Sequence, residues 1–313
     1  MIFVALWACA EPARRDVEVV QQARGALADT AASLTIRLLD LSTSKVGGLA
    51  VLVSDSSDGS AKHLLIDGGD VGARVARTLA RFQVGDLSLV VLTHAHDDHY
   101  GGLDAVMRTF RVAAFAYNGD PRNLVSYRRL LSTVERSAMR PIIVRDSLRR
   151  VQVVTAGDTL WVTLLPPAPR SAIRNGDPIN NRSVGVHLRY GAFSALIPGD
   201  AEHAQQRWWR QRFRRLLDAD VLVASHHGAN DANSSPRRPD WYNSVTPRLL
   251  LVGANGRQHP HRQVLDYARR LGIATYCTSS HGSIAVRASR DGEWTVRTER
   301  SMPCAAGIEV PAP

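Results

Sequence analysis

The sequence predicts an α/β domain in which sheets are covered by helices on both faces. Residues 89–92 and 221–224 are apolar without polar alternation, which is typical of strands that are buried on both sides. After Gly69, apolar residues recur at helical spacing and indicate an amphipathic helix, at Val71, Val75, Leu79 and Phe82. No low-complexity linker divides the chain, so we expect one domain built from two similar halves.

The other elements follow from apolar periodicity and from turn residues. Strands are predicted at residues 34–39, 49–53, 63–66, 87–93, 112–116, 142–144, 151–154, 160–164, 183–189, 192–197, 221–224, 249–252, 274–277, 284–286 and 294–296. Helices are predicted at residues 71–82, 103–110, 122–138, 201–217 and 264–271. Residues 166–182 are rich in proline, asparagine and glycine and are expected to form a loop.

The 313-residue chain has a formal net charge of +10 and is 44% hydrophobic, which is enough for a large core. Arginine supplies almost all of the positive charge, since Lys45 and Lys62 are the only lysines. A basic surface favours anionic partners such as nucleic acid, although a merely solvated basic surface has the same composition. No run reaches the ~18 apolar residues of a membrane span, and oligomeric state leaves no sequence signal.

The predicted organisation is a lead-in at residues 1–32, one folded domain at 33–300 and a loose tail at 301–313. Leu6-Trp7-Ala8-Cys9 resembles a bacterial lipobox, but no basic segment precedes it. The chain is therefore either cytoplasmic or an exported, periplasmic lipoprotein attached through Cys9. Cys277 and Cys304 would pair in the exported form, and would otherwise be a buried thiol and a tail thiol.

A dense group of metal-binding residue types follows the strand at residues 87–93. His94, His96, Asp97, Asp98 and His99 lie within six consecutive positions. Imidazole and carboxylate suit divalent transition metals, and His94 and His96 can point to the same side at a strand end. Once the chain turns, Asp98 and His99 can reach a second ion about 3.5–4 Å from the first. The sequence therefore predicts a site for two divalent metal ions.

One loop cannot fill two coordination spheres, so further ligands are expected at other strand ends. Asp200 follows an apolar strand and can bridge two cations, although it is also suited to cap the helix after it. His226 and His227 are adjacent and point apart. We favour His226 as the ligand and His227 as a residue that supports the ligands or contacts substrate. His259, before Pro260, is a further candidate for metal or substrate binding.

These residues resemble the metallo-β-lactamase superfamily. Its pattern HxHxDH is met in full at His94, His96, Asp98 and His99. The resemblance extends from residue 35 to 297 and implies a four-layer αβ/βα sandwich, two mixed sheets flanked by helices, with the metals at one edge. Asp67 resembles the structural aspartate of the family, Asp200 its bridging aspartate and His226 its last histidine ligand.

Within the superfamily the chain is most similar to the soluble hydrolase domain of the ComEC family of DNA-uptake (competence) proteins. The blocks that carry this resemblance are Asn180-Asn181-Arg182-Ser183, Pro198-Gly199-Asp200-Ala201-Glu202, Ser225-His226-His227-Gly228 and Gln258-His259-Pro260. The sequence resembles a stand-alone version of this domain, so the membrane channel of that family is not expected here. The histidine that the superfamily supplies in mid-chain is missing, and Asn180, Asn181 or Ser183 takes its place. Oxygen-richer coordination tolerates harder ions, so Mn²⁺ competes with Zn²⁺ as the working metal.

The resemblance implies a phosphodiesterase, a nuclease that acts on DNA through water activated between two metals. Asp98, Asp97 or His227 would supply the proton for the leaving group. Single-stranded DNA fits the run Arg207–Arg215, where Trp208 lies among arginines, but the same run also fits an ordinary amphipathic helix. The alternatives are a small-molecule hydrolase acting on a lactone, thioester, β-lactam or phosphoester, and a non-catalytic metal-binding module for DNA or a partner. A basic groove beside the metals would favour nucleic acid, and a closed apolar pocket a small molecule.

Overall fold

The computed structural model describes residues 33–41, 48–56, 61–70, 72–137, 139, 141–155, 158–233 and 240–307. The predicted lead-in at residues 1–32, with Cys9, and the end of the tail at residues 308–313 lie outside this part of the chain. Within it, no helix has both the length and the apolar character needed to cross a bilayer.

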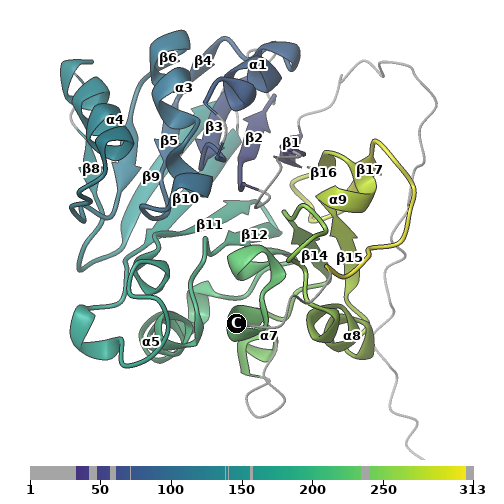
Figure 1. Cartoon of the computed structure of the whole chain (residues 1–313). Coiled ribbons are helices and arrows are strands. Elements are labelled where there is room, and N and C mark those ends of the chain that lie inside the picture. The colour runs from purple at the N-terminus through teal and green to yellow at the C-terminus, as the bar shows by residue number, and fades with distance from the viewer. Residues whose placement is uncertain are drawn as a thin grey trace, which may run out of the picture.

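Two large mixed sheets face each other across the domain (Figure 1). The eight-stranded sheet has the order β17 (Trp294–Thr298), β16 (Ile284–Ala288), β1 (Leu34–Leu38), β2 (Val51–Asp55), β3 (Lys62–Ile66), β5 (Leu89–Val91), β7 (Phe115–Tyr117) and β8 (Ile142–Ile143). The seven-stranded sheet has the order β15 (Ala274–Cys277), β14 (Leu249–Val252), β13 (Val221–Val223), β12 (Phe193–Ile197), β11 (Gly185–Tyr190), β10 (Asp158–Leu165) and β9 (Arg149–Thr155).

Helices cover the outer face of each sheet and complete four layers (Figure 1). Packed on the first sheet are α1 (Arg74–Arg81), α3 (Leu103–Thr109) and α4 (Val125–Arg136). Packed on the second are α5 (His203–Phe213), α7 (Asp240–Val245) and α8 (Arg262–Arg270). Short helices occupy loops, at α2 (Asp97–Tyr100), α6 (Asn230–Asn233) and α9 (Thr278–His281). The predicted four-layer αβ/βα sandwich is confirmed.

The central strands of each sheet are mostly apolar because they supply two cores. In β13, Val221 and Val223 belong to the core between the sheets, whereas Leu222 belongs to the core under the second set of helices. In β2, Val53 faces the central core and Leu52 the first set of helices. Side chains alternate along a strand, so a strand buried on both faces has no polar position to spare.

Several predicted elements differ in extent. The predicted strand at 87–93 is divided into β4 (Asp86–Leu87), which pairs with β6 (Arg111–Val112), and β5 in the main sheet. The predicted helix at 201–217 begins only at His203 and passes after Phe213 into a 3₁₀ turn. Residues 201 and 202, which were expected to begin this helix, instead belong to the loop between β12 and α5. The helix α7 had no clear apolar period and was not predicted.

The segment at residues 301–307 is attached to the domain. Cys304 forms a disulfide with Cys277 at the end of β15. The backbone N–H of Gly307 donates a 2.8 Å hydrogen bond to the carbonyl of Pro260. Of the two alternatives for these cysteines, the structure therefore has the paired one, and the tail begins against the loop that carries His259.

Candidate metal centre

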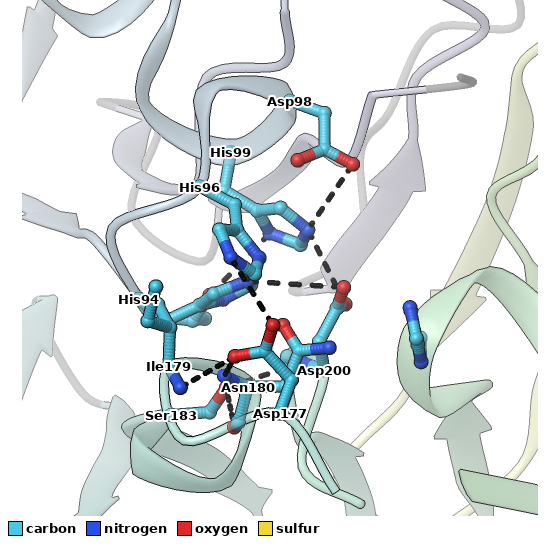
Figure 2. A network of polar contacts seen from close by, with 12 residues as sticks. His94, His96, Asp98, His99, Asp177, Ile179, Asn180, Ser183 and Asp200 are labelled. Atoms are coloured by element: carbon cyan, nitrogen blue, oxygen red, sulfur yellow. Dashed lines mark hydrogen bonds and ion pairs between the residues drawn. The ribbon is translucent and has the colours of Figure 1, made fainter. Parts of the chain in front are cut away.

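The candidate site lies where strands of both sheets end. In the first sheet β3 and β5 are parallel neighbours, followed by Asp67 and His94. In the second sheet β12 and β13 are parallel neighbours, followed by Asp200 and His227. Parallel neighbours end at the same edge of their sheet, so polar residues far apart in the sequence meet there (Figure 2).

The His94–His99 segment forms one wall of the site. Nε2 of His94 lies 3.1 Å from Nδ1 of His96, so these two nitrogens face the same point. The chain then turns into α2, which places Asp98 and His99 one step further along, with Asp98 Oδ2 3.9 Å from Nε2 of His99. Figure 2 shows the side chains of His94, His96 and His99 gathered on one side of Asp200.

Asp67 orients this wall from behind. Its two carboxylate oxygens accept hydrogen bonds from the backbone N–H of Thr93 at 2.8 Å and from the Thr93 hydroxyl at 2.8 Å. It also contacts Nδ1 of His99 at 2.7 Å. Because a carboxylate only accepts, Nδ1 of His99 carries the hydrogen and Nε2 is left free to bind a cation. Asp67 therefore has the supporting position that the family resemblance implied.

The adjacent histidines of the Ser225–Gly228 turn have different surroundings. His227 is buried, donates from Nδ1 to the Gly253 carbonyl at 2.7 Å, and places Nε2 3.2 Å from Asp98. His226 points away, with Nδ1 3.1 Å from the half-exposed carboxylate of Asp231. The structure thus brings His227 to the HxHxDH segment and leaves His226, the residue favoured from the sequence, at the rim. A run of two histidines carries no signal of which one turns inward.

Three candidate groups of ligand atoms lie among the described residues; two of them share His99, and the third, at the rim, consists of Glu202, His226 and Asp231. Of the two that share His99, one consists of His94, His99 and Asp200, and the other of Asp98, His99 and His227. Asp200 joins them, since its Oδ1 lies 3.2 Å from Nε2 of His99 and its Oδ2 lies 3.8 Å from both His94 and His227. This is the position expected of a carboxylate that bridges two cations.

The charges of the metal-free site indicate where cations would act. Burial alone lowers the pKa of His99, but the carboxylates of Asp200, Asp67 and Asp98 raise it well above its ordinary value. Against the effect of burial, His99 and His227 hold the pKa of Asp200 well below its usual range. Burial and the charge of His99 keep the pKa of His94 well below its usual range. A proton on His99 thus balances charge that a divalent cation would balance better.

The donor set fits divalent cations. Nε2 of His99 and Oδ1 of Asp200 are buried atoms without a hydrogen-bond partner among the described residues. These two atoms lie 3.2 Å apart as an ion pair without hydrogen-bond geometry. Buried polar atoms are almost always hydrogen-bonded, so a cation held between the two atoms would satisfy both. Imidazole and carboxylate suit Zn²⁺ and Mn²⁺ alike, so the donor set agrees with the expected class of ion.

A cavity of about 480 Å³ opens beside these residues. Of the predicted site residues, His96, Asp98, Asn180, Asp200, His226, His227 and His259 line it. Asp97 is exposed on the outside of α2, and Asn181 and Ser183 are buried behind the cavity. Three lining carboxylates were not predicted from the sequence, those of Asp177, Glu202 and Asp231. Glu202 lies within a sequence block noted above, but the loop residues Asp177 and Asp231 carry no pattern that would have identified them.

Comparison with known proteins agrees with this geometry. A family model described as "Metallo-beta-lactamase superfamily" matches residues 45–281, which include every residue placed in the site. ComE operon protein 3 of Bacillus subtilis (strain 168) is 24% identical over 207 residues, 65% of this chain and 25% of that protein. The uncharacterized protein YcaI of Escherichia coli (strain K12) is 23% identical over 216 residues, 68% of this chain and 24% of that protein. The matched segment thus spans about a quarter of each relative.

Solved structures show the same fold at low sequence identity. Tm1679, described as a metal-dependent hydrolase of the beta-lactamase superfamily, aligns with a TM-score of 0.51 at 14% identity, over 78% of this chain and 95% of that one. CmlA, a diiron beta-hydroxylase from Streptomyces venezuelae, aligns with a TM-score of 0.50 at 15% identity, over 82% of this chain and 54% of that one.

Proposed function

Because the chain belongs to the metallo-β-lactamase superfamily, whose members include metal-dependent hydrolases, we propose that it is a two-metal phosphodiesterase that cleaves single-stranded DNA. The observation that carries the proposal is the pair of ligand groups joined by His99 and Asp200 at the edge of the sandwich. Two cations bound there would activate water and polarise the phosphodiester under attack.

The chain's own residues prepare this chemistry by fixing which nitrogens face the cations. His94, His96 and Asp200 would hold the first cation, and Asp98, His99, His227 and Asp200 the second. Thr93 donates its hydroxyl hydrogen to Asp67, so its oxygen accepts from Nδ1 of His94 at 3.1 Å and leaves Nε2 free. The Gly253 carbonyl does the same for His227. Such outer contacts orient ligands before a cation arrives.

The cavity lining supports a charged substrate rather than an apolar one. Among the described lining residues there is no aliphatic or aromatic hydrocarbon side chain and no lysine or arginine, whereas five are carboxylates. An anionic phosphodiester can enter only after cations have neutralised these groups. A volume of about 480 Å³ suits a nucleotide unit better than a duplex. The resemblance to the ComEC hydrolase domain and the net charge of +10 support DNA as the polymer.

The test uses the purified chain with Mn²⁺ or Zn²⁺ and end-labelled single-stranded DNA, with a chelator as control. Asp98 lies 3.2 Å from His227 and belongs to the second ligand group, so Asp98→Asn should lower cleavage at least about 100-fold. Asp86→Asn, which changes an exposed carboxylate on β4, should retain wild-type activity.

The nuclease assignment is wrong if the wild type cuts no DNA with either metal, or if Asp98→Asn cuts equally well. Turnover of a small phosphodiester, lactone or thioester without DNA cleavage would instead identify a small-molecule hydrolase. Asp97→Asn distinguishes the proton donors named from the sequence. Because Asp97 lies outside the cavity, we expect this variant to remain active.

A further inference from the structure

The proposed site of the first cation has His94 and His96 but not the third histidine that the superfamily supplies in mid-chain. Asn180, Asn181 and Ser183 occupy that stretch of the sequence. All three are almost completely buried, so burial does not separate them. They are separated by what each polar atom already contacts.

The side-chain oxygens of Asn181 and Ser183 both already accept hydrogen bonds. The side-chain oxygen of Asn181 accepts a 3.0 Å hydrogen bond from the backbone N–H of Gln205. Its amide nitrogen donates to the Asp177 carbonyl and to Glu202. The Ser183 hydroxyl donates to the Asn180 carbonyl at 2.9 Å and accepts from the N–H of Asp200 at 3.2 Å. Both residues hold the loop against the strand end.

Asn180 differs because its side-chain oxygen accepts no hydrogen bond from the described residues. Its Nδ2 donates to Glu202 Oε1 at 2.9 Å, and its Oδ1 has no hydrogen-bond partner among the described residues although the residue is only 3% exposed. The orientation of the amide is determined, since Nδ2 must face the carboxylate, which accepts. Asn180 lines the metal cavity, and Figure 2 shows it beside Asp200 and below the rings of His94 and His96.

The chemistry of an amide oxygen restricts what it can bind. Oδ1 is an acceptor only, so its partner is a cation or a hydrogen-bond donor and cannot be a phosphate oxygen. The other side chains that line the cavity are mainly imidazoles and carboxylates, which suit divalent cations. Buried acceptors without a partner are rare, so we expect a cation bound in the site to be the partner of Oδ1.

We propose that Oδ1 of Asn180 is the neutral oxygen ligand that completes the first cation's site in place of a histidine. Glu202 is the positioning residue that holds the amide in this orientation. The inference rests on the proposed function, because it assigns a ligand within the same two-metal centre. An amide oxygen is a harder donor than imidazole, so it shifts the preference of the first site from Zn²⁺ toward Mn²⁺.

The contacts of Glu202 agree with a positioning role. Oε1 accepts from Asn180, and Oε2 accepts from the N–H of Asp177 at 2.9 Å and from Nδ2 of Asn181 at 2.8 Å. Both oxygens are therefore occupied by donors of the 177–183 loop. Gly176 makes this approach possible: its φ is +84°, and a Cβ there would lie 1.9 Å from Oε2 of Glu202.

Metal titration of the whole chain tests the proposal without an activity assay. Isothermal titration calorimetry with Mn²⁺ should show two sites in the wild type. In Asn180→Ala one site should weaken by about 10- to 100-fold while the other, formed by Asp98, His99 and His227, keeps its affinity. Glu202→Gln should weaken the same site, because it allows the Asn180 amide to turn over.

A double variant provides the matched control. Asn180→Asp combined with Glu202→Gln exchanges donor and acceptor between the two positions and keeps an oxygen facing the cation, so it should restore two Mn²⁺ sites. The proposal is overturned if Asn180→Ala binds both ions as the wild type does. It is also overturned if both sites weaken equally together with the melting temperature of the metal-free protein, because Asn180 would then only support the loop. A wild type that binds no metal would refute the proposed function itself.

Discussion

His226 and His227 are consecutive residues with similar backbones and opposite surroundings. Both have positive φ, 48° and 53°, in the left-handed region that residues other than glycine rarely adopt. Such a backbone costs of order 1–3 kcal/mol per residue and persists where the surroundings hold it. With this backbone, His227 points inward to Gly253 and Asp98, whereas His226 points to Asp231.

The two histidines should therefore respond differently to truncation. His227→Ala removes a proposed ligand of the second cation, and we expect calorimetry to show a loss of about 100-fold in affinity at one site. His226→Ala removes a rim residue and should retain two bound cations. If the two variants had the opposite effects, His226 would be the ligand, as the sequence had suggested, and the site would have to rearrange on metal binding.

The surroundings of His226 favour its charged form when no metal is bound. Burial opposes that charge, but the hydrogen bond to Asp231 and the carboxylates of Asp200 and Glu202 raise its pKa to about 9. A cationic imidazole at the cavity rim is suited to contact a substrate phosphate. His226 and His227 thus exchange the roles that the sequence had favoured for them, within our proposal.

At the scale of elements, a disulfide cross-link joins the end of β15 to the tail. The disulfide between Cys277 and Cys304 closes a loop with a sequence separation of 27 residues. A disulfide that closes a loop of this length stabilises the folded state by about 3 kcal/mol, mainly because the bond restricts the unfolded chain. Three residues beyond the disulfide, Gly307 is hydrogen-bonded to Pro260, next to His259.

Cys304→Ser should accordingly lower the free energy of unfolding by about 3 kcal/mol in urea denaturation under non-reducing conditions. Reductant should reproduce this loss in the wild type and have no effect in the variant. Thiol titration of the denatured chain should detect one free thiol before reduction and three after it, since the chain has 3 cysteines. Three free thiols in the unreduced protein would contradict the pairing.

At the scale of the whole molecule, charge is divided between an acidic cavity and a basic exterior. The net charge is +10, yet the metal cavity is lined by carboxylates and histidines. On α5, Arg207 is exposed and Trp209 is completely buried, and Arg214 is exposed in the 3₁₀ turn that follows the helix. Trp208 packs edge-on against Phe213 with ring centroids 5.3 Å apart, so its ring is partly used by the core. The helix therefore offers charge more readily than a stacking surface.

DNA binding should then depend strongly on salt. If Arg207 and Arg214 contact phosphates, Arg207→Glu with Arg214→Glu should reduce the slope of log K against log[salt] by at least about 1.4, because each single-strand phosphate contact contributes about 0.7. Arg77→Glu with Arg81→Glu, which makes the same charge change on α1 at the opposite side of the molecule, should alter the slope much less (Figure 1). Equal slopes for the two variants would show that α5 does not guide the strand. Fluorescence anisotropy in a salt series measures both.

The sequence by itself determined the fold class and most of the first wall of the site. Doubly buried strands such as β13 have a continuous apolar pattern, and the HxHxDH residues are neighbours along the chain, so local information was sufficient for both. Asp200 was also predicted, because it directly follows an apolar strand. Only the tertiary structure decided which of His226 and His227 faces Asp98 and which polar atom near residue 180 remains unpaired. Those choices depend on a strained turn and on hydrogen bonds between residues such as Asn180 and Glu202, 22 positions apart, and no local pattern records such partners.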